Sequence, residues 1–62
     1  MNLTTQQAEK KINQKYLGFC VHGSLTIVSQ NEKTMVVRFL DDHGVVRTVT
    51  ANKCGKTIRW SF

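Results

Sequence analysis

Residues 33–51 constrain the fold of this chain more than any other stretch. They read Lys-Thr-Met-Val-Val-Arg-Phe-Leu, then Asp-Asp-His-Gly, then Val-Val-Arg-Thr-Val-Thr-Ala, so apolar and polar residues alternate on both sides of a polar tetrapeptide. Alternation with a period of two, interrupted by turn residues, predicts two strands joined as a β-hairpin. Asp bonds nearby backbone amides in turns, and Gly adopts positive φ without steric cost. We expect Ile27, Val37, Phe39 and Val49 to build the shared inner face.

The sequence before the hairpin predicts one amphipathic helix at residues 4–16. Thr4 and Gln7 have the spacing of a capping box. A thin apolar stripe recurs every four residues, at Ala8, Ile12 and Tyr16. The lysines of this segment lie off the stripe, so we expect the helix to lean on a sheet through a narrow face.

Short strands are expected on both sides of the hairpin. Residues 19–22 and 24–29 precede it, and residues 57–60 form a closing strand after an irregular turn. Short, closely spaced strands favour a small antiparallel barrel. We therefore predict a mainly β (α+β) single domain over residues 1–62, with an SH3-like barrel of four to five strands at 19–60. The SH3-like assignment rests on analogy with the order of the elements.

The charge balance points to an anionic partner. Nine Lys and Arg stand against four Asp and Glu, which gives a formal net charge of +5. This balance favours nucleic acid as the first partner class. The alternative is that the charge only keeps a small domain soluble. Because the chain has neither a long apolar run nor the pattern of a secretory signal, we expect a cytoplasmic protein that does not enter the membrane.

Cations and one aromatic residue on the hairpin and the closing strand are the candidate nucleic-acid-binding residues. In a small barrel these elements would be neighbours. Lysine and arginine neutralise phosphates, and an exposed aromatic ring stacks on a base. The alternative is that the tryptophan seals the core and the arginines are ordinary solvated strand positions. The predicted set is Arg38, Arg47, Lys53, Lys56, Arg59 and Trp60.

Four residues have side chains of the kind that binds zinc, namely Cys20, His22, His43 and Cys54. A structural zinc site needs four such ligands, usually in pairs two to four residues apart, and this spacing does not fit. A disulfide is not expected in a reducing cytoplasm. We predict no metal, no other cofactor and no disulfide.

No set of residues specifies catalysis. Asp41 and Asp42 are adjacent, so they would diverge on a strand and would bond backbone amides in a turn. Residues 55–57, Gly-Lys-Thr, lack the upstream glycine of a phosphate-binding loop and precede a strand. We predict that the chain is not an enzyme.

A further expectation comes from a resemblance. The pattern consists of Gly-Ser-Leu-Thr-Ile-Val-Ser at 23–29, Val-Val-Arg-Phe at 36–39, Gly44, Asn52 and Gly-Lys-Thr-Ile at 55–58. It resembles the small accessory β module that precedes the nuclease part of tailed-phage proteins related to HNH homing endonucleases. The resemblance implies phage origin, the host cytoplasm and an accessory role in nucleic-acid binding. No His-Asn-His set accompanies it, so cutting activity is not expected.

Two main functional hypotheses follow from these patterns. The first is a small phage-type protein that binds nucleic acid, with DNA favoured, through phosphate contacts and limited stacking. The second is a phage protein that binds a host enzyme and inhibits or redirects it, for which an exposed strand edge is a common docking mode. A structural or oligomerising module is a third alternative.

Overall fold

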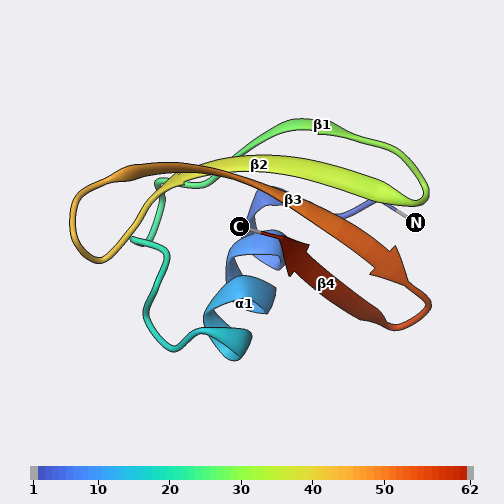
Figure 1. The fold of residues 1–62 in the computed structure, drawn as a ribbon, viewed down its shortest axis with the longest axis horizontal. Helices are drawn as coiled ribbons and strands as arrows, with labels where there is room; N and C mark the ends of the chain where they lie inside the picture. Colours follow the sequence, from blue (N-terminus) through green and yellow to red (C-terminus); the bar gives the residue numbers. More distant parts are fainter. Residues whose placement is uncertain (1, 62) are drawn as a thin grey trace.

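The computed structural model describes residues 2–61, which form one helix and four strands (Figure 1). The elements are α1 (Thr5–Lys15), β1 (Thr26–Gln30), β2 (Thr34–Leu40), β3 (Val46–Cys54) and β4 (Thr57–Ser61). The strands lie in the order β1-β2-β3-β4, and each is antiparallel to the next. The prediction of a mainly β chain with one N-terminal helix is confirmed.

The sheet is open, so closure into an SH3-like barrel is not confirmed. β1 and β4 are its two edges, and no pairing joins them within residues 2–61. Residues 19–22 do not form a strand and contribute only an isolated bridge between Cys20 and Asp41. Figure 1 shows the bent sheet curving around α1. The helix buries Ala8 and Ile12 in the core on the inner face, which is the side that the strands of a closed barrel would fill with their own side chains.

The core lies between this inner face and α1. Every second residue of β2 faces the core, namely Met35, Val37 and Phe39. The register places Ala51 of β3 opposite Met35, and Val49 opposite Val37. All five are at most 1% exposed. The helix completes the core with its two buried residues, Ala8 and Ile12. Burying a large apolar side chain contributes roughly 1.5–3 kcal/mol, so these contacts are the main source of stability.

The predicted inner face is confirmed at three of its four positions. Val37, Phe39 and Val49 are buried, whereas Ile27 is partly buried and packs against the edge of the core. β1 carries a register shift between Ile27 and Ser29, which is a β-bulge that locally bends a strand.

The capping box predicted for the helix is also confirmed. Thr4 Oγ1 accepts a hydrogen bond from the backbone N–H of Gln7 at 3.2 Å, and the side-chain Oε1 of Gln7 accepts one from the backbone N–H of Thr4 at 2.9 Å. The helix ends at Lys15, and Gly18 follows with a φ of 67°, a conformation that favours glycine. Among the described residues, no helix has the length and apolarity that crossing a membrane requires.

Candidate nucleic-acid interface

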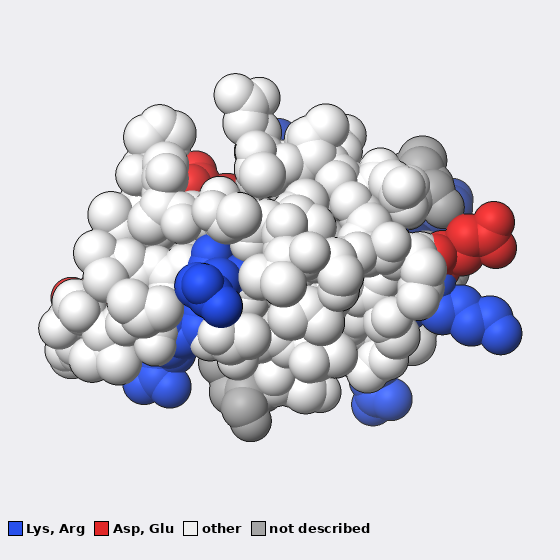
Figure 2. All heavy atoms as spheres, turned by 90° about the horizontal axis from the view of Figure 1, so that it is seen from above, with Lys and Arg blue, Asp and Glu red and all other residues white. Residues whose placement is uncertain are grey.

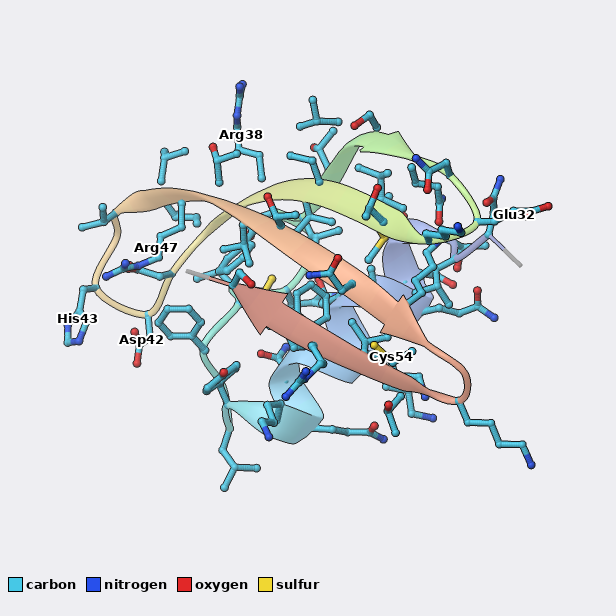
Figure 3. The ribbon with its side chains drawn as sticks, turned by 45° about the vertical axis from the view of Figure 1, so that its right-hand side comes forward. Glu32, Arg38, Asp42, His43, Arg47 and Cys54 are labelled. Carbon is cyan, nitrogen blue, oxygen red and sulfur yellow. The ribbon has the colours of Figure 1, made fainter. Side chains whose placement is uncertain are left out.

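The strand register distributes the predicted binding residues over both faces of the sheet. Arg38 pairs with Thr48 and lies on the outer face, away from the buried positions of β2. Arg59 pairs with Asn52 on the same outer side of β4. Figure 3 shows Arg38 projecting from the sheet on the side opposite α1. Arg38 and Arg59 therefore lie on the opposite face of the sheet from those predicted residues that face α1.

Arg47 is held at the closed end of the hairpin. Its Nε donates to Asp41 Oδ2 at 2.6 Å, and its guanidinium carbon lies 5.5 Å from the centroid of the Phe19 ring. Asp41 is fully buried and also accepts hydrogen bonds from the His43 and Val45 amides at 2.9 and 2.8 Å. The hydrogen bond from Arg47, followed by those from the backbone, holds the pKa of the Asp41 carboxyl below its usual value. Arg47 is therefore a structural partner of the turn.

The remaining predicted residues lie on the side of the molecule where α1 meets β4. A groove of about 340 Å³ runs between these two elements. Its walls are Lys11, Gln14 and Lys15 of α1, the turn residue Lys56, and Thr57, Ile58 and Trp60 of β4. We call this hollow the basic groove. It contains Lys56 and Trp60 of the predicted set.

A second hollow of about 180 Å³ adjoins the basic groove, because Lys11, Lys56 and Ile58 line both. Lys53 also lines the second hollow, and its Nζ donates to Gln30 Oε1 and to the Asn31 carbonyl, both at 2.7 Å. Four lysines from the helix, β3 and the following turn thus gather on one side of the molecule. We call Lys11, Lys15, Lys53 and Lys56 the lysine strip.

The chain has four acidic residues, Glu9, Glu32, Asp41 and Asp42, and the structure describes all of them. None of the four lines either hollow. Glu9 lies on another side of α1, where its carboxylate accepts from the Gly23 amide and contacts His22 Nδ1, each at 2.8 Å. The Gly23 amide, and then His22, lower the pKa of Glu9. Figure 3 places Glu32 and Asp42 at opposite ends of the molecule. The lysine strip therefore presents a positive field without acids among the residues that line it.

The sequence prediction missed Lys11 and Lys15. Both residues lie one turn apart, at i and i+4, and adjoin the buried positions Ala8 and Ile12 on the helix. That spacing was the available signal, since it places two cations at the border of the stripe that packs on the sheet. Lys10 occupies the opposite side of the helix and lines neither hollow.

The outer face of the sheet has a different character. Figure 2 views the molecule from above and shows a largely uncharged surface, with charged side chains mostly at its margins. The pairs Val36–Thr50 and Leu40–Val46 lie on this face, and Val46 is 63% exposed.

The residues with zinc-binding side chains do not gather. Cys20 is buried, Cys54 is exposed, and both are free thiols. His22 contacts Glu9, and His43 lies 3.7 Å from Asp42. Within residues 2–61, no three His, Cys, Asp or Glu side chains are placed to hold a metal ion.

Comparison with protein-family models, curated proteins and solved structures finds no match to this chain. The resemblance to the phage accessory module therefore stays a hypothesis.

Proposed function

We propose that the protein binds nucleic acid, with DNA favoured, by placing phosphates along the lysine strip. One observation carries the proposal: two lysines of α1, one of β3 and one of the following turn gather where no acid lines the surface, namely Lys11, Lys15, Lys53 and Lys56. Each lysine that neutralises a phosphate releases condensed counterions, and this release drives binding. Lysine contacts to phosphate carry no sequence information, so little discrimination between sequences is expected.

The resemblance to the phage accessory module leads to the same proposal by a separate route. On this view the protein acts in the cytoplasm of the host, as a binding protein and not as an enzyme. The proposed binding does not depend on closure of the sheet into an SH3-like barrel, because α1, β3, β4 and the turn between these two strands line both hollows in the open sheet.

The second candidate function is binding to a host protein. The observation that favours it is the largely uncharged outer face, where the exposed Val46 and the partly buried Val36 and Leu40 lie near Arg38, and where Arg59 lies on the edge strand. β1 and β4 are the edge strands of the sheet formed by residues 2–61, and edge strands permit strand addition. This function would depend on apolar anchors and would resist moderate salt.

A salt titration separates the two functions. We expect the affinity for random-sequence DNA to fall as salt rises, with a slope of log affinity against log salt of about −2 to −4 for three or four phosphate contacts. Fluorescence anisotropy of labelled oligonucleotides at several salt concentrations measures this slope. Binding weaker than about 10⁻⁴ M at low salt would contradict the proposal, since non-specific binding alone reaches that affinity.

Charge reversal in the lysine strip should weaken this binding. We expect Lys11→Glu and Lys56→Glu each to reduce the magnitude of the salt slope by about 1 and to weaken binding to every sequence equally. Lys10→Glu is the matched control, because it makes the same change of charge on the same helix outside both hollows. An equal loss of affinity in Lys10→Glu would mean that only net charge matters and that the lysine strip is not the contact.

A further inference from the structure

We infer that the basic groove receives an unpaired nucleotide with its base against Trp60, so that the protein prefers single-stranded DNA to duplex. This inference rests on the proposed function and specifies the ligand of the same site. It follows from the side chains that line the groove, from how they are held and from the size of the hollow.

The floor of the groove is apolar and fixed. Trp60 pairs with Ala51, so its side chain lies on the inner face of the sheet, and it packs against the core while remaining partly exposed. Ile58 precedes it by two residues on the same face and is also partly buried. An indole held by the core is ordered before any ligand arrives, so a base that stacks on it does not have to order the side chain.

Cations from two other segments of the chain also line the groove. Lys11 and Lys15 approach from α1, whereas Lys56 approaches from the turn before β4. Gln14 adds a side-chain amide that can donate to phosphate and pair with a base edge. The Thr57 hydroxyl donates to the Cys54 carbonyl at 2.9 Å, so toward a ligand it can only accept, for example from a base N–H. Cations beside an aromatic ring are the combination that binds a single strand, since the backbone meets the cations and the base meets the ring.

The position of Trp60 on the inner face of the sheet disfavours duplex. The open hollow of about 340 Å³ is lined by α1 and by β4, and Trp60 of β4 is only partly exposed in it. The bases of a duplex are stacked inside it, so one of them would have to leave the stack to reach Trp60. A duplex would therefore meet only the lysines at the rim, while a single strand gains the stacking contact without that cost.

Trp60 is the only tryptophan in the chain, so its fluorescence reports directly on the groove. We expect a short oligodeoxythymidylate to quench this fluorescence on binding. A strand of equal length built from abasic sites should bind through its phosphates with little quenching. A duplex of equal length, compared per phosphate, should also quench little and should bind roughly tenfold more weakly than the single strand.

Trp60→Leu tests the base contact by affinity, measured as anisotropy of labelled strands. The variant should lose roughly tenfold in affinity for the single strand and keep its affinity for duplex. Circular dichroism checks that the Trp60→Leu variant folds. If the variant does not fold, the quenching experiment on the unaltered protein still tests whether a base contacts Trp60. Equal affinity for both forms without quenching would overturn the inference and leave the proposed function intact, whereas binding to neither form would overturn both.

Discussion

Replacing Phe39 with alanine is expected to lower the free energy of unfolding by about 3–5 kcal/mol. Phe39 is 1% exposed, and its ring meets that of Phe19 edge to face with the centroids 5.6 Å apart. The substitution would leave a cavity in the middle of the inner face. A chain of 62 residues has a small core and little stability to spare, so this loss should leave the variant largely unfolded at 37 °C. Thermal and urea melts followed by circular dichroism measure the effect.

Val46→Ala is the matched control, because it also shortens an apolar strand residue but at a position that is 63% exposed. Its expected cost is below about 1 kcal/mol. A Phe39→Ala variant that melted within a few degrees of the unaltered protein would show that the inner face has been assigned to the wrong side of β2.

Removing the Asp41 carboxylate is expected to produce the other large loss of stability. Asp41→Ala leaves three donors without their acceptor, namely the amides of His43 and Val45 and the Nε of Arg47. We expect the melting temperature to fall by roughly 10 °C. The melting temperature of Asp41→Asn should lie between those of Asp41→Ala and the unaltered protein. The asparagine side-chain oxygen still accepts hydrogen bonds from the backbone, but it carries no charge to pair with Arg47. A melting temperature unchanged in Asp41→Ala would contradict this role.

The same carboxylate predicts a dependence of stability on pH. Its pKa is lowered in the folded state, first by Arg47 and then by the Val45 amide. A lowered folded pKa means that the stabilisation is present above the unfolded value of about 3.9 and is lost as the pH falls through the folded value. Melting temperatures of the unaltered protein and of Asp41→Asn should therefore converge below about pH 4. A difference that stays constant from pH 7 to pH 2 would exclude this ion pair as its source.

Local patterns explain which parts of the fold were predictable from the sequence. The capping box of Thr4 and Gln7 and the alternation around Phe39 depend on residues close in the chain, and both were confirmed. Barrel closure depends on long-range packing. The open sheet follows from where α1 packs, and neither that packing nor the β-bulge after Ile27 can be read from alternation.

The candidate site was less predictable, because it joins the two ends of the chain. Lys53, Lys56 and Trp60 were predicted because cations and an aromatic residue fall on the hairpin, the closing turn and the closing strand. Their neighbours Lys11 and Lys15 become part of the site only when α1 packs beside β4. Arg47 was predicted as a binding cation, yet the register places it opposite Phe39 on the inner face, where Asp41 holds it.

The most direct test of the account maps the contact surface residue by residue. Amide chemical shifts of ¹⁵N-labelled protein are followed by NMR while a short single-stranded oligonucleotide is added at low salt. We predict that the largest changes fall at residues 11–15 and 53–60, which carry the lysine strip and the floor of the basic groove. Changes confined to the outer face, at Val36, Arg38, Thr48 and Thr50, or no changes at all, would contradict the assignment of nucleic-acid binding to this site.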